Sequence, residues 1–305
     1  MEYRSLGRSG LKVSVAGLGC NNFGMRLDEA GSAAVIHAAL DAGITLFDTA
    51  RMYGGGRSEE FLGRALVGHR DEVVIATKFG ASQDPAESGG SRRHLMKSVE
   101  TSLRALQVEA IDLLQLHYPD PSTPIDETLG ALDDLVHAGK VRYLGCSNFN
   151  GWMIADAAWT ARTRGFEPFV SAQNEWSLLN RDIEREVLGA CNRFGFGVLP
   201  YFPLASGVLT GKVRKGERPP EGSRLNLSYF QAALTDTNLD RVERIAEWGA
   251  ARDRSVAEVA LSWLASQPTV GSVIAGATSP AQVQANASLT KADLTPEEVA
   301  EVAAL

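Results

Sequence analysis

Residues 44–53 of the chain are Ile44-Thr45-Leu46-Phe47-Asp48-Thr49-Ala50-Arg51-Met52-Tyr53. The apolar run at 44–47 predicts a short buried strand, and the three glycines at 54–56 predict a loop after it. Asp48 therefore stands where the strand ends, and Tyr53 lies five positions further on, in the loop. A strand followed by a helical segment indicates a parallel α/β sheet, in which ligands bind at the carboxyl ends of the strands. This stretch thus predicts where the chemistry of the protein takes place.

The same alternation of an apolar strand and an amphipathic helix continues along the chain. Strands are predicted at 16–20, 44–47, 73–78, 111–116, 141–145, 168–173, 197–201 and 272–274. Helices are predicted at 27–42, from about 58, at 96–106, 125–138 and 182–193, between 145 and 168, at 239–252 and 255–266, and a final one after Pro280. Eight such units in one run predict that residues 1–305 form a single (β/α)8 TIM barrel domain, in the α/β class, rather than an open doubly wound sheet. Residues 2–15 predict an N-terminal β-hairpin that closes the bottom of the barrel.

Composition limits the classes of function. A chain of 305 residues fits one barrel of roughly 250 residues with extensions, and its net charge of 30 − 37 = −7 argues against a nucleic-acid-binding protein. The three cysteines, Cys20, Cys146 and Cys191, are widely spaced, which fits a reducing compartment and indicates no zinc site. The sequence has no apolar run long enough to cross a bilayer and no apolar core of a signal peptide, so we expect a cytoplasmic protein without membrane partners.

Four ionisable side chains follow neighbouring predicted strands. Asp48 and Tyr53 follow the second strand, Lys78 ends the third and His117 follows the fourth. Because a free tyrosine has a pKa of about 10, an adjacent ammonium is expected to lower that pKa and to make the phenol a usable acid. Asp48 is expected to hold the ammonium, and His117 to orient a substrate oxygen toward Tyr53.

Each of these residues has a structural explanation when it is taken alone. Asp48 fits a strand-end cap, Tyr53 loop packing, Lys78 a solvated lysine and His117 a hydrogen-bonded structural histidine. Their occurrence at consecutive strand ends favours a common site over four separate explanations.

Further motifs extend this pattern over nearly the whole chain. They are Phe47-Asp48-Thr49-Ala50 with Tyr53-Gly54, Ala76-Thr77-Lys78, Leu116-His117, Gly145-Cys146-Ser147-Asn148-Phe149, Gln173-Asn174-Glu175-Trp176, and Tyr201-Phe202-Pro203-Leu204 with Gly207-Val208-Leu209-Thr210-Gly211-Lys212. With these motifs in this order, the chain resembles the aldo-keto reductase superfamily, and within it the bacterial and potassium-channel-β-like branch.

The resemblance implies an NADP-dependent aldo/keto reductase, that is, an alcohol:NADP oxidoreductase acting on a small-molecule carbonyl substrate. Hydride from NADPH would reduce an aldehyde or ketone to an alcohol, while Tyr53 donates the proton, Lys78 and Asp48 tune it, and His117 positions the carbonyl. No metal is implied. The residues implied for cofactor binding are Ser147, Asn148, Gln173, Tyr201, Phe202, Pro203, Leu204, Ser206, Gly207, Lys212, Arg224, Gly276, Thr278, Gln282 and Asn286.

The cofactor is expected to be NADP, with NAD as the alternative. Many members of the superfamily carry a cation in the last βα turn to pair with the 2′-phosphate, whereas here no lysine or arginine lies between Ile274 and Asn286. The aromatic and methionine side chains expected to line the substrate pocket are Phe23, Met25, Met52, Tyr118, Trp176 and Tyr229.

Two other functions remain open at the level of the sequence. One is a cofactor-binding regulatory module of the same fold that turns over slowly. The other is a lyase in which Lys78 forms a Schiff base with a carbonyl substrate, although the 202–212 loop would then have no purpose. The physiological substrate, the favoured direction and the oligomeric state are left undetermined.

Overall fold

The computed structural model describes residues 1–81, 89–220 and 223–305, with the backbone alone for residues 224 and 228–230. The strands are β1 Tyr3–Ser5, β2 Lys12–Ser14, β3 Ala16–Gly19, β4 Leu46–Asp48, β5 Val74–Phe79, β6 Ile111–Leu116, β7 Val141–Ser147, β8 Phe169–Glu175, β9 Gly197–Tyr201 and β10 Val273–Gly276. The α-helices are α1 Glu29–Asp41, α2 Arg57–Ala65, α3 Arg92–Leu106, α4 Ile125–His137, α5 Gly151–Arg164, α6 Val187–Phe194, α7 Asp236–Ala250, α8 Val256–Ala265, α9 Pro280–Leu289 and α10 Pro296–Ala304. Short 3₁₀ segments are η1 Tyr53–Gly56, η2 Arg70–Glu72, η4 Asp182–Arg185, η5 Ala205–Thr210, η6 Arg224–Asn226 and η7 Ser228–Ala233.

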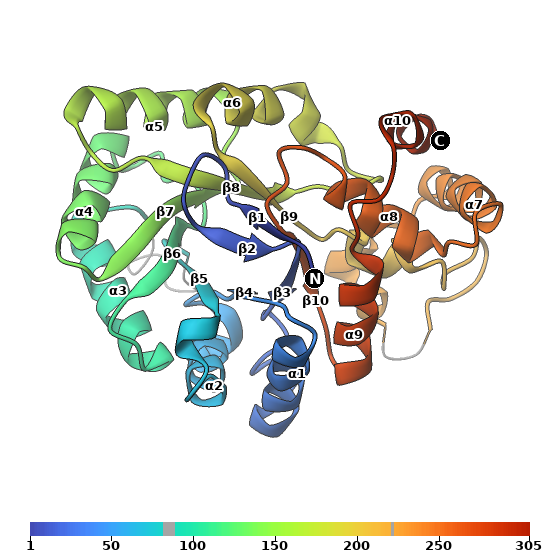
Figure 1. Ribbon diagram of the computed structural model, residues 1–305, viewed down its shortest axis with the longest axis horizontal. Helices are drawn as coiled ribbons and strands as arrows, with labels where there is room; N and C mark the ends of the chain where they lie inside the picture. Colours follow the sequence, from blue (N-terminus) through green and yellow to red (C-terminus); the bar gives the residue numbers. More distant parts are fainter. Residues whose placement is uncertain (82–88, 221–222) are drawn as a thin grey trace.

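In the described part of the chain, β3 to β10 form one eight-stranded parallel sheet in the order β10-β3-β4-β5-β6-β7-β8-β9. The sheet curls into a barrel, because the backbone N–H of Val198 in β9 donates to Thr269 O at 2.8 Å and that of Gly271 donates to Val198 O at 3.0 Å, just before β10 begins. Helices ring the barrel on the outside (Figure 1). The predicted TIM barrel is confirmed.

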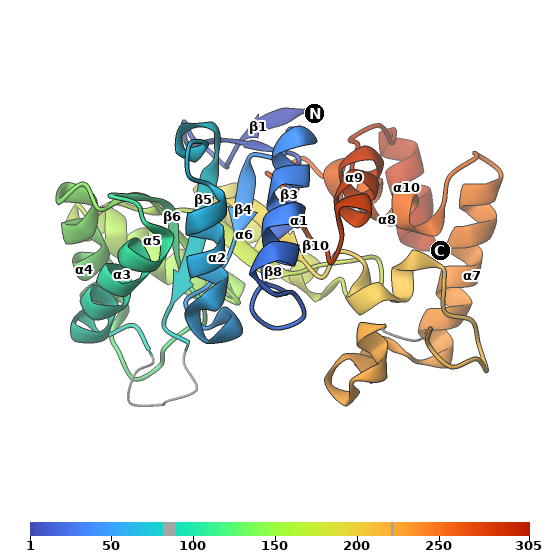
Figure 2. The same cartoon turned by 90° about the horizontal axis from the view of Figure 1, so that it is seen from below.

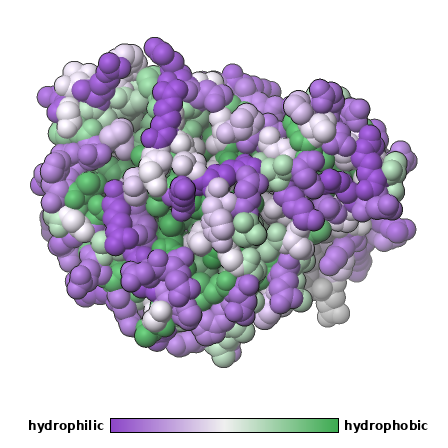
Figure 3. All heavy atoms as spheres, in the orientation of Figure 1, coloured by the Kyte–Doolittle hydropathy of each residue, from purple (hydrophilic) through white to green (hydrophobic). Residues whose placement is uncertain are grey.

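The hairpin of β1 and β2 lies across one end of the barrel, also as predicted (Figure 1). Leu6 and Val13 are fully buried and pack with apolar barrel side chains such as Leu113. Gly7, with φ +59°, fits tightly against the α6–β9 connection, since a Cβ there would lie 2.5 Å from Gly195 O. On this face of the molecule, hydrophilic and apolar residues are interspersed (Figure 3).

The barrel interior changes from apolar to polar along its axis. Next to the hairpin, Leu46, Ala76, Leu113, Leu199 and Ile274 form a buried apolar cluster. Two residues further along their strands come Asp48, Lys78 and Gln115, which therefore face the same interior. All three are at most 3% exposed. Buried charge and amide groups thus gather toward the carboxyl ends of the strands, where ligands bind in barrels of this kind.

The connections at that end are longer than those at the hairpin end. Figure 2 shows the hairpin at the top edge and the 3₁₀ segments that follow β9 at the lower edge, so the two lie at opposite ends of the molecule. The long insertion between β9 and α7 contains η5, η6 and η7.

The structure corrects several predicted boundaries. Asp48 is the last residue of β4 rather than the residue after it, and the predicted helix at 182–193 is divided into η4 and α6 by the non-helical backbone of Glu186 (φ −145°, ψ −35°). A further helix, α10, follows the one predicted to be last. Its N-terminus carries a capping box between Thr295 and Glu298, with Pro296 in the first turn, a signal that the sequence does contain.

Candidate active site

Asp48 and Lys78 form a buried ion pair at the ends of β4 and β5. Lys78 Nζ donates to Asp48 Oδ2 at 2.6 Å and to the carbonyl oxygen of Thr49 at 3.0 Å, and Lys78 is 1% exposed. Burial by itself would lower the pKa of Lys78, but the charge of Asp48 and the hydrogen bonds of Asp48 and Tyr53 to the ammonium outweigh it, so that the pKa is raised. Lys78 is therefore a fixed cation at neutral pH.

The second oxygen of Asp48 accepts hydrogen bonds from two amides. Gln173 Nε2 donates to Asp48 Oδ1 at 2.8 Å and Gln115 Nε2 donates to the same atom at 3.2 Å. Gln115 was not among the predicted site residues, although its place in β6, two positions after Leu113 and so on the same side of the strand, is a signal of an inward-facing amide. The carboxylate thus has partners on both oxygens, as a buried charge requires.

Tyr53 lies beside this ion pair because β4 leads into a tight turn. Its backbone N–H donates to Ala50 O at 3.0 Å, and Gly54 and Gly55 after it have φ of +59° and +68°, which glycine adopts without strain. Lys78 Nζ lies 5.2 Å from the centroid of the Tyr53 ring. The predicted neighbourhood of the phenol and the ammonium is therefore present.

The net direction of the Tyr53 pKa differs from the expectation. Lys78 does lower it, by its charge and by a hydrogen bond, but burial has the larger effect and raises the pKa above its usual value of 10.0. The correction has a chemical consequence. The phenol stays protonated at neutral pH, and the ammonium is placed to stabilise the phenolate that proton donation leaves behind.

His117 follows β6 and packs against two tyrosines. Its ring meets Tyr53 edge to face with centroids 5.9 Å apart, and Tyr118 stacks on it at 4.8 Å with an interplanar angle of 6°. Burial, and then the charge of Lys78, lower the pKa of His117 from 6.5 to about 3, so the imidazole is neutral in the physiological range. Its Nδ1 is buried without a hydrogen-bond partner among the described residues, as expected of a group that awaits a ligand.

Comparison with known proteins identifies the family of the chain. Residues 16–305 match the model of the aldo/keto reductase family. The chain belongs to the aldo/keto reductase family. It is 36% identical over 317 residues to the "Probable voltage-gated potassium channel subunit beta" of Oryza sativa subsp. japonica, covering 100% of this chain and 96% of that protein. It is also 37% identical over 289 residues to the "Uncharacterized oxidoreductase YrpG" of Bacillus subtilis (strain 168), covering 90% and 87% of the two chains.

A second relative carries the same channel name. The "Probable voltage-gated potassium channel subunit beta" of Arabidopsis thaliana is 36% identical to this chain over 296 residues, covering 94% of this chain and 90% of that protein. The sequence motifs resemble the bacterial and potassium-channel-β-like branch of the family. The names of these relatives, two potassium channel β subunits and one bacterial oxidoreductase, agree with that resemblance.

Of the residues expected to hold the nicotinamide, three lie together beside His117. Asn148, with φ +61°, donates from Nδ2 to His117 O at 2.9 Å and to Ser147 Oγ at 3.2 Å, and Tyr201 OH donates to Asn148 Oδ1 at 2.8 Å. Gln173 is placed differently, because its amide is bonded to Asp48 in the barrel interior. The position of Tyr201 at the end of β9 brings an aromatic ring to the rim of the barrel next to these amides.

Several residues after β9 have a left-handed backbone conformation. Phe202, Ala205, Ser206 and Gly207 have φ of +51°, +45°, +58° and +110°. Left-handed residues in succession turn neighbouring N–H groups toward a common concavity, and three of the four are not glycine, so each costs about 1–2 kcal/mol. Strain of this kind persists at functional sites. Two of these N–H groups are already engaged, since Ala205 N donates to Phe202 O and Gly207 N donates to Leu204 O, each at 2.8 Å.

The other residues expected around the cofactor fall into two groups. Lys212 is exposed just after η5 and Pro203 and Leu204 lie between β9 and η5, whereas the side chain of Arg224 lies outside the described residues. In the last βα turn, Gln282 Oε1 accepts from Thr278 N at 2.8 Å and from Thr278 Oγ1 at 3.1 Å, and Asn286 Nδ2 donates to Gly276 O at 3.4 Å. This turn is thus organised by its own side chains.

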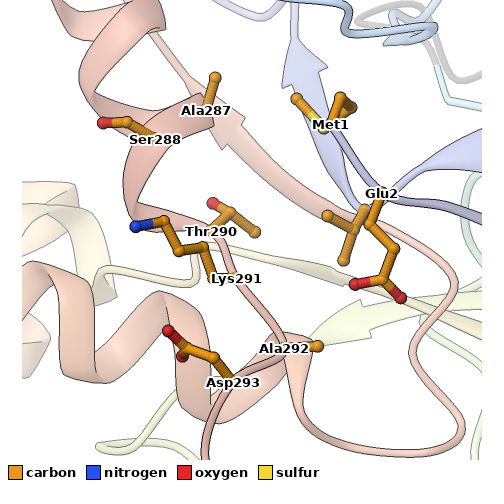
Figure 4. Close-up of a pocket in the computed structure, with 9 residues that line it drawn as sticks. Met1, Glu2, Ala287, Ser288, Thr290, Lys291, Ala292 and Asp293 are labelled. Atoms are coloured by element: carbon orange, nitrogen blue, oxygen red, sulfur yellow. The ribbon is translucent and has the colours of Figure 1, made fainter.

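The expected substrate-lining residues divide by exposure. Met25, Met52 and Tyr118 are exposed to 71%, 37% and 50%, as pocket walls would be, whereas Phe23 and Trp176 are buried in the core and are wrongly placed by the sequence. The side chain of Tyr229 lies outside the described residues. A hollow of about 440 Å³ lies elsewhere, between Met1 and Glu2 and the residues around Thr290 and Lys291, and the four catalytic candidates do not line it (Figure 4).

Among residues 1–81, 89–220 and 223–305, no group of three or more histidine, cysteine, aspartate or glutamate side chains is arranged to hold a metal ion. No helix in the same residues has both the length and the apolar character needed to cross a lipid bilayer.

Proposed function

We propose that this aldo/keto reductase uses a reduced nicotinamide cofactor, NADPH or NADH, to reduce an aldehyde or ketone to an alcohol. The observation that carries the proposal is the convergence of Tyr53, the Asp48–Lys78 ion pair and the neutral imidazole of His117 at one rim of the barrel. A protonated phenol, a fixed cation and a neutral hydrogen-bonding ring are the groups that carbonyl reduction needs from a protein.

The residues present fit a nicotinamide dinucleotide. The strained backbone of residues 205–207 fits a pyrophosphate, and Asn148, Ser147 and Tyr201 are placed for the carboxamide and the face of the ring. Once bound, the cofactor supplies the hydride for the carbonyl carbon. Whether Gln173 also reaches the carboxamide depends on its leaving Asp48, to which it donates in this structure.

The protein's part of the reaction is proton transfer. His117 orients the carbonyl oxygen by a hydrogen bond, and Tyr53 gives its hydroxyl proton to that oxygen, which yields the alcohol and a Tyr53 phenolate. Lys78 stabilises the phenolate, and Asp48 compensates the charge of Lys78 in a site from which water is largely excluded. Proton uptake from solvent then restores the phenol for the next turnover.

The structure disfavours Schiff-base chemistry at Lys78. A lysine attacks a carbonyl as the neutral amine, and this one is held as an ammonium by Asp48, with a raised pKa. A regulatory module with slow turnover is the stronger alternative, because relatives at 36% identity carry the name of a potassium channel β subunit.

The deciding experiment titrates the protein with NADPH and with NADH by the quenching or enhancement of cofactor fluorescence. Each complex is then mixed with a panel of aldehydes and ketones, and oxidation of the cofactor is followed. We expect binding and multiple turnovers with at least one carbonyl compound. Binding without turnover on any of them would favour the regulatory module, and a borohydride-trapped adduct on Lys78 would favour the lyase.

A further inference from the structure

Gln115 is a buried amide that the reaction proposed above leaves without a role. It is 0% exposed, it lies in β6 two residues before His117, and its strand register places it directly opposite Lys78. Its Nε2 donates to Asp48 Oδ1 at 3.2 Å, and its Oε1 accepts from Gln173 Nε2 at 3.4 Å. Gln115 therefore belongs to the same network as the ion pair while facing neither solvent nor the mouth of the barrel.

The barrel makes room for this side chain. Gly145 of β7 pairs with Gln115, and a Cβ at that position would lie 2.5 Å from Ser171 Oγ and 3.1 Å from Gln115 Cγ, so the glycine leaves space for both side chains. The layer below, where Leu113 faces the interior, is apolar. An amide in this position needs a polar partner, because an unbonded amide costs about 1–3 kcal/mol when buried.

We propose that Gln115 is a positioning residue that holds the Asp48 carboxylate so that its Oδ2 stays on the Lys78 ammonium; the inference rests on the proposed function. The two oxygens of Asp48 are divided between the partners, with Oδ1 accepting from the amides of Gln115 and Gln173 and Oδ2 accepting from Lys78. Gln173 sits near the rim and is expected to serve the cofactor, whereas Gln115 has no second partner at the mouth. Gln115 is then the amide that stays on Asp48 throughout the reaction.

The first test replaces Gln115 by leucine. Leucine has a similar side-chain volume but lacks the amide that donates to Asp48. With Asp48 held less firmly, Lys78 loses part of the interaction that keeps it charged, so we expect kcat to fall about tenfold. The alkaline limb of the kcat profile for reduction should move to higher pH, because an ammonium that is held less well lowers the pKa of Tyr53 less. The other ionisable groups facing the pair are Tyr53, His117 and the thiol of Cys20, which follows β3, and none of them is substituted.

Leu113→Met is the matched control, since it changes the shape of an interior side chain on the same strand without touching the network. It should leave the pH profile where it is. Two results would overturn the proposal. One is a Gln115→Leu enzyme with the wild-type kcat and pH profile. The other is a Gln115→Leu enzyme that is slower but whose alkaline limb, like that of Leu113→Met, does not move.

A second test does not depend on activity. Gln115→Leu is introduced into the wild type and into an Asp48→Asn variant, and urea unfolding measures how much free energy of unfolding each protein loses. Charge-assisted hydrogen bonds are about twice as strong as neutral ones, so the loss should be larger when Asp48 is a carboxylate. Equal losses in both backgrounds refute the proposal. If the wild type proves inactive on all carbonyl compounds but the coupling is found, the proposed reaction fails while the positioning of Asp48 by Gln115 stands.

Discussion

Lys78 Nζ lies 2.6 Å from Asp48 Oδ2 inside the barrel, and each side chain is at most 4% exposed. In such a place an ion pair gives little net stability, because desolvation offsets most of the attraction. The position of this ion pair next to Tyr53 and His117 is better explained by a role in proton transfer than by a role in stability. A cation held in a fixed position by a buried carboxylate is ready to stabilise a phenolate, and four of the five predictions below concern this pair and the groups gathered around it.

Tyr53→Phe should abolish carbonyl reduction and leave NADPH binding within about twofold, because it removes the transferable proton and little else. Losing a general acid costs about 10²–10⁴-fold in rate. The measurement pairs single-turnover cofactor oxidation with a fluorescence titration. Retained turnover would remove Tyr53 from the acid role.

Lys78→Met should slow turnover and move the pH dependence upward. Lys78 is a group that lowers the pKa of Tyr53, so without the ammonium that pKa rises further. Reduction, which needs the phenol, is then lost at a higher pH than in the wild type, and alcohol oxidation, which needs the phenolate, also begins at a higher pH. Profiles of kcat in both directions test this, and a profile that does not move would contradict the assigned role.

The same substitution should destabilise the fold. It leaves Asp48 charged and buried without its cation, which costs about 3–5 kcal/mol. The matched control is Arg164→Met on α5, which breaks the solvent-exposed pair with Asp126 and should cost less than about 1 kcal/mol. Urea unfolding at neutral pH measures the free energy of unfolding of both variants. Equal losses would show that removing the cation of the buried pair costs no more than removing that of an exposed pair.

His117 should make the protein less stable in acid. Its pKa is lowered to about 3 in the folded protein, whereas the unfolded chain has the ordinary value near 6.5. Between these values the unfolded state binds the extra proton, so stability is complete above about pH 6.5 and falls by up to about 1.4 kcal/mol per unit as pH drops toward 3.

Replacing His117 by glutamine should flatten that dependence, as measured by urea unfolding from pH 7 to pH 4. The exposed His37 of α1 provides the control, and His37→Gln should leave the slope of the wild type unchanged. If the stability of the wild type depends on pH no more steeply than that of His117→Gln, the imidazole of His117 is protonated inside the folded protein and the prediction is wrong.

Gly207→Ala should weaken cofactor binding through the backbone alone. At φ +110° an L-residue is strained, but the nearest heavy atom to an added Cβ is Leu225 Cδ1 at 4.0 Å, so no clash is involved. We expect the 205–207 segment to rearrange and the affinity for NADPH to fall about fivefold to thirtyfold, which corresponds to strain of about 1–2 kcal/mol.

Gly139→Ala is the matched control for this change. Gly139 also has a positive φ, +72°, and no heavy atom within 4 Å of an added Cβ, but it lies between α4 and β7 at a distance in sequence from the cofactor segment. It should lower stability without changing the affinity for NADPH. Equal loss of affinity in the two variants would count against an anion site at 205–207.

The sequence by itself determined the barrel and which side chains gather at the candidate site on its rim. Strand periodicity and turn residues are local, and in a parallel barrel the ends of successive strands must meet, so Asp48, Tyr53, Lys78 and His117 could be placed together without coordinates. The helix at 296–304 was also encoded locally, by its capping box, and was overlooked.

Only the tertiary structure decided how these groups act on one another. The pKa of Tyr53 is a balance between burial and the charge of Lys78, and the degree of burial depends on side chains from many strands. For the same reason Gln173, expected at the cofactor, was found on Asp48, and Gln115 was not expected at all. Which hydrogen-bond acceptor an inward-facing amide reaches depends on distances across the barrel, and those distances are fixed by closure of the sheet rather than by the residues next to it in the chain.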